Sequence, residues 1–265
     1  MFLKKKVYYR ISIVGAGNVA SHLAPVLEGA GHEVVEVYSR QFSNAEQLCE
    51  GLYNAVPKAD LDFSGSNAQI FIIAVPDQHI VEVARQIVLP EGSVLVHTSG
   101  SIDMGALEND SEASIGVFYP LQTFTKNTEV NFKEIPLLVE GEDKATLKIV
   151  KSLAESLSRK VHEVDSEQRA VLHIAAVFSC NFTNHMITIA QDMVESHAIN
   201  FELLKPLIAE TISKSLNIGP KAAQTGPARR GDQAVVDKHT LFLEEANPEL
   251  AQIYRLISQN IVKSS

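Results

Sequence analysis

The feature that most constrains the fold is a short apolar run followed at once by a glycine-rich turn. Residues 11–14 read ISIV, and the next six are Gly15, Ala16, Gly17, Asn18, Val19 and Ala20. In such a G-x-G-x-x-A pattern the first glycine permits a tight turn, the second lets a pyrophosphate approach the backbone, and the small third residue lets helix and strand pack closely. The helix that follows would point its N-terminus at the anion. We therefore predict a dinucleotide site that includes residues 15–19; a glycine turn kept only for packing is the alternative.

The end of the next strand-like run bears on which dinucleotide binds. The run HEVVEVYS ends at Ser39 and is followed by Arg40, roughly 20 residues past the glycine loop, where an NAD site usually carries a carboxylate. A serine there does not repel a 2′-phosphate, and an arginine can pair with it through two N–H donors. Ser43 and Asn44 can add neutral hydrogen bonds. The pattern favours NADP over NAD, unless Arg40 is an ordinary surface residue.

Strand-like and helical runs alternate up to about residue 164, and only helical patterns follow. Such alternation is typical of an α/β protein with a doubly wound, mostly parallel sheet, here a Rossmann fold. An all-α C-terminal domain is expected after it, with helices at about 166–197, 201–217, 231–245 and 247–262. We predict a dinucleotide domain over 1–164 and a helical domain for substrate and dimer contacts over 165–265. Asp165 or Ser166 is expected to cap the first of these helices.

Small residues end two further strand-like runs, at the edge where ligands bind in open parallel sheets. The run QIFIIAVP (69–76) ends with three residues that we expect to lie near the cofactor ribose: Ala74, Val75 and Pro76. Asp77, which comes next, is expected to cap the following helix. Thr98 and Ser99 end the run SVLVHTSG (93–100). They either contact the nicotinamide or the substrate, or they form a plain turn.

Candidates for moving a proton occur in both halves of the chain. Tyr119 ends the run ASIGVFYP, and a buried phenol can donate a proton if its pKa is lowered, although packing is its more common role. In the helical half, the apolar segment 173–190 carries His173, Asn181 and Asn184. Polar side chains in an apolar helix either make hydrogen bonds in a core or line a cavity. We predict that His173 or Tyr119 handles the proton and that Asn181 positions the substrate or carboxamide. No compact set of His, Asp and Glu has metal-ligand spacing.

The stretch QTGPARRGD (224–232) interrupts the helical pattern with a Gly-Pro pair. Asp232 is expected to cap the next helix. Arg229 and Arg230 either bind an anion, such as a substrate carboxylate, or pair with acids across a subunit contact.

Composition excludes several classes of protein. The formal net charge is −9, and basic residues cluster only near the N-terminus, which argues against nucleic-acid binding. Two cysteines are too few for a disulfide framework. The N-terminal segment lacks the long apolar stretch of a signal peptide, and the apolar run near residues 170–180 is too short and too polar to span a bilayer. A soluble cytoplasmic protein is therefore expected.

Several of these motifs together resemble a known group of enzymes. The loop GAGNVA, the segment IIAVPDQHI and the segment HTSGS are similar to the dinucleotide domain of the superfamily of β-hydroxyacid dehydrogenases and pyrroline-carboxylate reductases. The segments GVFYPLQTF and QTGPARRGD resemble a bacterial branch of candidate NADP oxidoreductases that have a Rossmann-like domain and a helical C-terminal domain of unknown function. The resemblance covers nearly the whole chain. It implies a helical domain like that of 6-phosphogluconate dehydrogenase, NADP as cofactor, and a homodimer built through the helices.

Two positions depart from the patterns of that superfamily. In its hydroxyacid dehydrogenases a lysine precedes an asparagine by four residues on the first interdomain helix; Asn181 fits the asparagine, but Val177 stands at the lysine position. In the related prephenate dehydrogenases a histidine precedes the proline after the sixth strand, and here that position is Tyr119. The cofactor half of the resemblance therefore transfers, whereas the acid–base residue does not.

The sequence thus predicts an NADP-dependent oxidoreductase that transfers a hydride between nicotinamide and a small carbonyl, imine or alcohol. One alternative is an NADP reductase with a deazaflavin as partner, because similar dinucleotide domains occur there and that chemistry needs no protein acid. Another is a non-enzymatic sensor that binds NADP(H) and signals through its helical domain.

Overall fold

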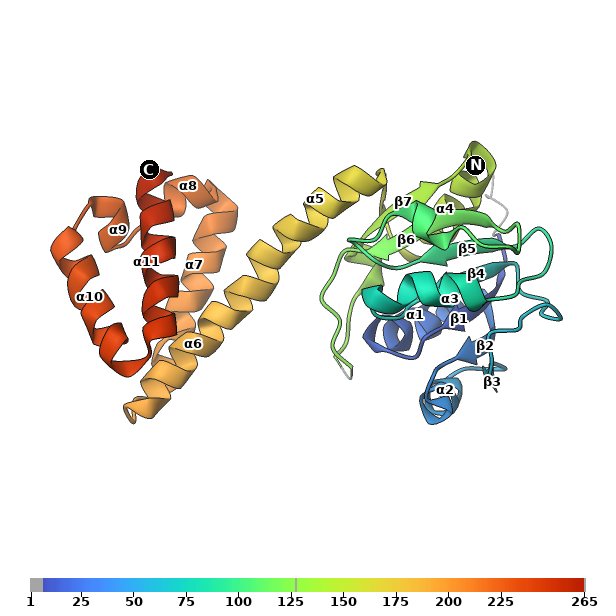
Figure 1. Ribbon diagram of the computed structural model, residues 1–265, viewed down its shortest axis with the longest axis horizontal. Helices are drawn as coiled ribbons and strands as arrows, with labels where there is room; N and C mark the ends of the chain where they lie inside the picture. The colour runs from blue at the N-terminus through green and yellow to red at the C-terminus, as the bar shows by residue number, and fades with distance from the viewer. Residues whose placement is uncertain (1–6, 127, 265) are drawn as a thin grey trace, which may run out of the picture. The chain divides into compact units, whose positions relative to one another are not determined.

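The computed structural model describes residues 7–126 and 128–264, which form two compact units. One unit extends to Asn184, and the other begins at His185 (Figure 1). The boundary predicted between residues 164 and 165 falls at the start of a helix, Ser166–Ser196, that runs past the end of the first unit. It stays a prediction.

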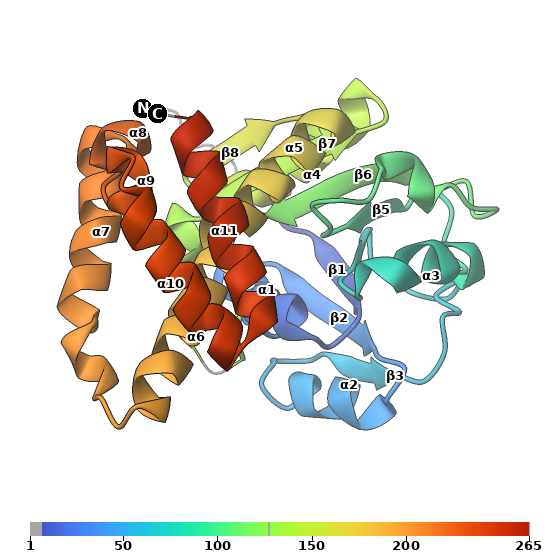
Figure 2. The same cartoon turned by 60° about the vertical axis from the view of Figure 1, so that its left-hand side comes forward.

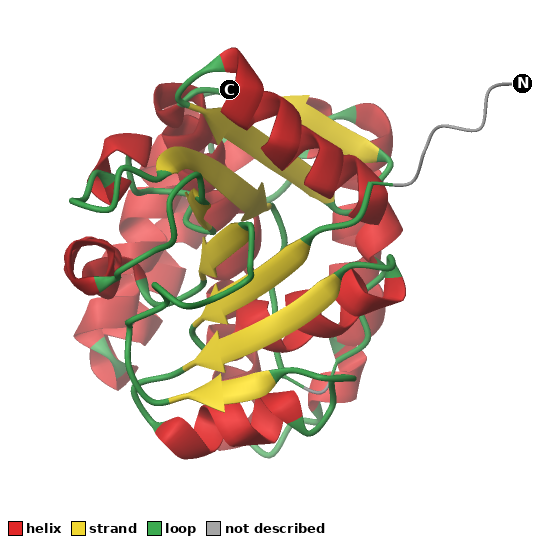
Figure 3. Cartoon of the chain, turned by 90° about the vertical axis from the view of Figure 1, so that its right-hand side faces the viewer, coloured by secondary structure: helices red, strands yellow, loops and turns green. Residues whose placement is uncertain are grey.

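The first unit is built on one twisted sheet. Within the described residues its strands are β1 (Arg10–Val14), β2 (Glu33–Tyr38), β3 (Val56–Lys58), β4 (Ile70–Ile73), β5 (Val94–His97), β6 (Ser114–Pro120), β7 (Pro136–Gly141) and β8 (Lys160–Glu163). Their order is β3-β2-β1-β4-β5-β6-β7-β8, and the pairs are parallel except β6 with β7 (Figure 3). Because the chain moves outward from β1 to β3 and then returns to β4 on the other side of β1, a topological switch point lies between β1 and β4.

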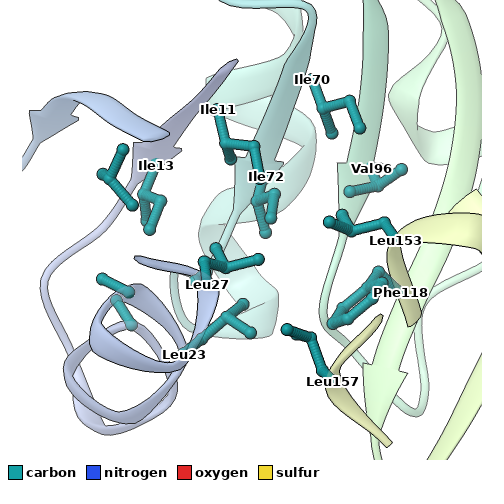
Figure 4. Close-up of a cluster of buried hydrophobic side chains, with 14 of the residues drawn as sticks. Ile11, Ile13, Leu23, Leu27, Ile70, Ile72, Val96, Phe118, Leu153 and Leu157 are labelled. Atoms are coloured by element: carbon teal, nitrogen blue, oxygen red, sulfur yellow. The ribbon is translucent and has the colours of Figure 1, made fainter. Parts of the chain in front are cut away.

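Helices cover both faces of this sheet and bury alternate strand residues. The helices of this unit are α1 (Asn18–Gly29), α2 (Phe42–Cys49), α3 (Ile80–Gln86), α4 (Lys144–Leu157) and α5 (Ser166–Ala176). One core cluster joins strand residues such as Ile11 and Ile72 to Leu23 of α1 and Leu153 of α4 (Figure 4). The cluster on the other face contains Phe71 and α3 residues. Each fully buried aliphatic or aromatic side chain contributes roughly 1.5–3 kcal/mol.

The antiparallel strand β7 follows from the connection that leads to it. Parallel neighbours need a crossover of a dozen or more residues, usually a helix, whereas an antiparallel return needs none. Between β6 and β7 the described residues form only a short 3₁₀ turn, Phe132–Glu134, so the chain turns back directly. The predicted fold class, a mostly parallel Rossmann-type sheet followed by a helical C-terminal region, is confirmed.

The helical region begins with a capped helix. Asp165 accepts a hydrogen bond from the Gln168 backbone N–H at 2.8 Å, and the Gln168 side chain accepts one from the Asp165 N–H, so the two form a capping box. α5 passes without a break into a π-helical segment, Val177–Phe182, and then into α6 (Thr183–Ser196). A capped start at Asp165 agrees with the predicted one.

The second unit consists of helices only in its described residues. After the end of α6 these are a 3₁₀ turn (Phe201–Leu203), α7 (Lys205–Ile218), α8 (Pro220–Ala223), α9 (Pro227–Arg230), α10 (Gln233–Ala246) and α11 (Pro248–Lys263). Figure 2 shows α10 and α11 side by side. Asp232 caps α10 through the Val235 N–H, as predicted, and Asn247 caps α11 with Pro248 in its first turn.

One described helix meets the length and composition of a membrane-spanning segment, so the expectation that its apolar run is too short and too polar for one was wrong. Ser166–Ser196 has a mean hydropathy of 1.2 over its most apolar 18 residues, and none of that window is buried. Length and hydropathy alone do not distinguish a membrane span from an apolar helix that another protein surface covers.

Candidate functional site

The two glycines of the turn after β1 serve different purposes. Gly15 has a φ of +117°, and a Cβ atom there would lie 2.4 Å from the Ala74 carbonyl oxygen, so only glycine fits. By contrast, Gly17 has a φ of −84°, and no atom lies within 4 Å of where its Cβ would be. Neither strain nor crowding within the protein requires a glycine at position 17. Because Gly17 has no side chain, the space beside the turn is open, and a ligand can approach the backbone there.

A cavity of about 570 Å³ opens at this point, at the carboxyl ends of β1, β2 and β4. Its lining includes eight of the predicted cofactor residues: Gly15, Ala16, Gly17, Ser39, Arg40, Ala74, Val75 and Pro76. Of the other predicted residues in this region, Asn18 and Val19 form the first turn of α1 and Ser43 lies in α2; none of these three lines the cavity. The glycine loop, the end of β2 and the end of β4 therefore meet at the switch point, where open α/β sheets bind ligands.

The chemistry of the cavity suits an anionic ligand. Helix α1 begins here with no acidic residue in its first turn, so its unpaired N–H groups and dipole face the cavity uncompensated. Arg40 is exposed, and its neighbour Asn44 donates from Nδ2 to Gln41 Oε1 at 3.1 Å. Side chains that the sequence did not single out complete the wall, among them Leu61, Gln78, His79, Glu82, Val83, Gln86 and Lys126.

The hydroxyls at the end of β5 are used within the turn. Thr98 Oγ1 donates to the Ile73 carbonyl at 3.3 Å, and Ser99 Oγ accepts from the backbone N–H groups of Ser101 and Ile102, each at 3.1 Å. Both residues are buried, and neither lines the cavity. Their contact with nicotinamide or substrate stays a prediction.

Asp77 does not cap the next helix, so that expectation was wrong. It opens a 3₁₀ turn, Asp77–His79, whose N-cap is Pro76, and no side chain caps α3. Instead, the Asp77 carboxylate accepts a hydrogen bond from Ser101 Oγ at 2.5 Å. Pro76 occupies the N-cap position of the turn, and the hydrogen bond from Ser101 holds the Asp77 carboxylate, so this carboxylate does not cap α3.

Tyr119 and His173 meet at this edge of the sheet. The Tyr119 hydroxyl lies 3.1 Å from His173 Nδ1, and the two rings are in an edge-to-face arrangement with centroids 6.1 Å apart. Gly100 makes room for them, because a Cβ atom on it would lie 2.6 Å from His173 Nδ1 and 2.7 Å from Tyr119 Cζ. The structure thus joins the two residues predicted separately as proton donors, from β6 and α5, and adds Gly100, which sequence reasoning missed.

Burial shifts the proton affinities at this edge. It raises the pKa of Tyr119, the Asp77 carboxylate raises it further, and Arg169 opposes the shift. Tyr119 is therefore a neutral phenol at physiological pH, and the lowered pKa considered from the sequence is not found. Burial also lowers the pKa of His97 to about 4, so that imidazole is neutral, and its Nδ1 accepts from the Ser99 N–H at 3.1 Å.

A buried ion pair fixes the helix that carries His173. Arg169, one turn before His173, is only 1% exposed, and its guanidinium pairs with Glu140 of β7. It also donates to the Ile102 carbonyl at 2.6 Å and to Ser166 Oγ at 3.0 Å. Since residues four apart lie on one helical face, this clamp also sets where the His173 ring points. In the sequence, the one sign of this ion pair is that Arg169 stands alone in an otherwise apolar helical pattern.

Asn181 is not part of this cluster. It is exposed and lies in the π-helical segment Val177–Phe182, roughly two turns beyond His173. Short π-helical stretches inside α-helices often occur at functional sites, and the periodicity of a sequence does not reveal them. A role for Asn181 in positioning substrate stays a prediction. Among the residues that the structure describes, no group of three His, Cys, Asp or Glu could hold a metal ion.

Comparison with known proteins defines the class. Residues 4–115 match the model of a Rossmann-like domain, and residues 135–261 match a domain of unknown function, DUF2520. The structure of BF3122 from Bacteroides fragilis, described as a candidate NADP oxidoreductase, is 39% identical to the chain, with a TM-score of 0.87, and the match covers 96% of this chain and 98% of that one. No curated protein sequence matches the chain.

More distant structures share the fold. Plasmodium falciparum pyrroline carboxylate reductase with NADP bound is 17% identical, with a TM-score of 0.61 and coverage of 96% and 98% of the two chains. The Aspergillus terreus reductive aminase in complex with NADPH and ethyl levulinate is 16% identical, with a TM-score of 0.67 and coverage of 98% and 95%. The fold is that of a Rossmann-like domain followed by a helical region. The chain belongs to the family of candidate NADP oxidoreductases that join a Rossmann-like domain to a DUF2520 domain.

Proposed function

We propose that this protein is an NADP-dependent oxidoreductase that transfers a hydride between nicotinamide and a small carbonyl, imine or alcohol. The observation that carries the proposal is the cavity at the switch point, where the open Gly17, the N-terminus of α1 and Arg40 line one space. A pyrophosphate fits the first two of these features, and a 2′-phosphate fits the third. The bound cofactor would supply or accept a hydride.

The residues around the cavity divide by the part of the cofactor they suit. Gly15, Ala16 and Gly17 would hold the pyrophosphate through their backbone, while Ser39 and Arg40, after the end of β2, would bind the adenosine ribose and its 2′-phosphate. The apolar side chains of Leu61 and Val83 also line the cavity and could pack against the face of an adenine ring. Comparison with the NADP complex of pyrroline carboxylate reductase and the NADPH complex of reductive aminase supports the same class of cofactor.

Tyr119 and His173 supply the acid–base chemistry in this proposal. Because Tyr119 stays neutral, it can donate to His173 Nδ1, and the imidazole proton then sits on Nε2. Tyr119 keeps the ring in that tautomer. His173 Nε2 can then pass its proton to a developing alkoxide or amide anion while Nδ1 takes the proton of Tyr119, which solvent restores to the Tyr119 oxygen. In the oxidative direction the same relay runs backwards: Nε2 accepts the proton of an alcohol while Nδ1 returns its proton to a Tyr119 oxygen that has lost its own to solvent.

The test of the cofactor is Arg40→Ala. We expect the dissociation constant for NADPH to rise by about tenfold or more, since charge-assisted hydrogen bonds contribute about 1.5–3 kcal/mol, while that for NADH changes little. Arg159→Ala, at an exposed position outside the cavity, is the matched control. Equal losses for NADPH and NADH in Arg40→Ala would remove the argument for NADP.

The test of the chemistry is the pair of variants Tyr119→Phe and His173→Asn. Both are expected to keep NADPH binding and to lose turnover on a panel of small carbonyls and imines, because general acid–base catalysis contributes about 10²–10⁴-fold. Full activity in both variants would point to the deazaflavin partner, whose chemistry needs no protein acid. Tight NADPH binding by the wild-type protein without turnover on any compound would point to a sensor.

A homodimer is part of the proposal. Helix Ser166–Ser196 leaves its most apolar window unburied within one chain, and large apolar side chains such as Phe178 and Phe182 are 65% and 47% exposed. Contiguous apolar surface of this kind supports a protein interface. Light scattering coupled to size exclusion is expected to give twice the mass of one chain; the mass of a single chain at micromolar concentration would contradict it.

A further inference from the structure

We infer that Lys126 is a second cation for the extra phosphate of NADP, acting beside Arg40. The inference rests on the proposed function, because it assigns a specificity residue to the same cavity. Lys126 lies in the connection between β6 and β7, far in sequence from the glycine loop and from the end of β2. The sequence pattern of a dinucleotide domain therefore does not point to it.

Lys126 lies on the wall of the candidate cofactor cavity. It lines the 570 Å³ cavity together with Ser39, Arg40 and Asn44. It also lines a neighbouring, more polar cavity of about 500 Å³, which shares Ala16 and Asn44 with the first. Lys126 is thus next to both the phosphate-binding turn and the start of α2, the region where a 2′-phosphate belongs.

One ring contact and one hydrogen bond hold the segment before Lys126 against α1, and a second ring contact packs it on Phe132. His22 of α1 has its Nε2 2.9 Å from the Thr125 carbonyl oxygen, and because a carbonyl only accepts, that nitrogen carries a proton. The Phe124 ring packs against His22 with centroids 5.2 Å apart and stacks on Phe132 at 5.7 Å. These contacts fasten the backbone directly before Lys126 to α1, whose N-terminus lies at the cavity.

The charged side chains that line the cavity are mostly basic. Among the residues that line the 570 Å³ cavity, the lysines and arginines are Arg40 and Lys126, and the acid is Glu82. Glu82 lies 3.6 Å from His79 Nδ1, at the α3 side of the cavity. A 2′-phosphate carries between one and two negative charges at neutral pH, and one guanidinium does not neutralise it. The flexible ammonium of Lys126, on the lining of the same cavity, suits the remaining charge.

The experiment is a calorimetric titration of NADP⁺ and NAD⁺ into the wild-type protein, Lys126→Ala, Arg40→Ala and the double variant. Lys133→Ala, which removes the same charge from an exposed position outside both cavities, is the matched control. We expect Lys126→Ala to weaken NADP⁺ binding by about tenfold and NAD⁺ binding by less than about twofold, with no change in Lys133→Ala.

A second variant tests whether the contacts of His22 with Phe124 and Thr125 hold Lys126 in place. His22→Ala is expected to weaken NADP⁺ binding severalfold in the wild-type background and to add little in the Lys126→Ala background, because it acts through the lysine. Adenosine 2′,5′-bisphosphate and 5′-AMP, titrated in the same way, separate the 2′-phosphate from the pyrophosphate: only the bisphosphate should lose affinity in Lys126→Ala.

The failures of the two proposals are distinguishable. If the wild-type protein takes up neither dinucleotide, the proposed function fails. If it binds NADP⁺ and responds to Arg40→Ala, but Lys126→Ala changes nothing or weakens both dinucleotides equally, the inference about Lys126 alone is wrong.

Discussion

The buried pair of Arg169 and Glu140 makes the sharpest prediction about how the site is held. Replacing Glu140 with methionine leaves a guanidinium that is 1% exposed without its counter-ion, and such a loss typically costs about 3–5 kcal/mol. Replacing Arg169 with methionine leaves a carboxylate that is 16% exposed and still accepts from the N–H and Oγ of Ser166. That change is expected to cost less, about 1.5–3 kcal/mol.

The double variant decides whether the pair behaves as a buried ion pair. With methionine at both positions no charge is stranded, and well-packed apolar replacements of buried pairs are often neutral or stabilising. We therefore expect the double variant to be more stable than Glu140→Met alone. Urea unfolding followed by circular dichroism measures the free energies. Glu163→Met, which breaks the exposed pair with Lys151, is the control and should cost at most about 1 kcal/mol. A double variant less stable than Glu140→Met would refute the reasoning.

Three further predictions concern single residues. Gly15→Ala is expected to abolish NADPH binding in calorimetry, because the new Cβ would meet a backbone carbonyl at 2.4 Å with a φ of +117°. Gly100→Ala should cost about 1–3 kcal/mol in urea unfolding and slow turnover by separating Tyr119 from His173, and unchanged stability would contradict the geometry. Folding lowers the pKa of His97 from 6.5 to about 4, so the unfolded chain binds a proton in this pH range that the folded protein does not. The free energy of unfolding is therefore highest above pH 6.5 and falls by roughly 3 kcal/mol as the pH is lowered toward 4. Urea unfolding at several pH values should show a flatter pH dependence in that window for His97→Asn.

Local signals in the sequence were enough to predict most of the first unit. The glycine turn, the apolar β-branched runs and the cap at Asp165 act within a few residues, so pattern alone places them. β3 was missed because Val56–Lys58 is a three-residue edge strand with a proline at its centre, and it pairs only with β2. Its hydrogen bonds come from a neighbour distant in sequence, which no local pattern reports.

Site residues divide in the same way. The cavity residues at the ends of β1, β2 and β4 could be predicted, because the switch point of a doubly wound sheet fixes where strand ends meet. The Tyr119–His173 contact could not, since it depends on the Arg169 clamp and on the room left by Gly100. Lys126 reaches the cavity only because the connection after β6 folds back onto α1. Asp77 failed as a cap because a tertiary contact, Ser101, outcompetes the local one.

The most direct test of the account is a calorimetric titration of the pure wild-type protein with NADP⁺ and NAD⁺ under identical salt and pH. The account predicts one NADP⁺ bound per chain with at least about tenfold preference over NAD⁺. Preference for NAD⁺, or no uptake of either dinucleotide at millimolar concentration, would contradict it.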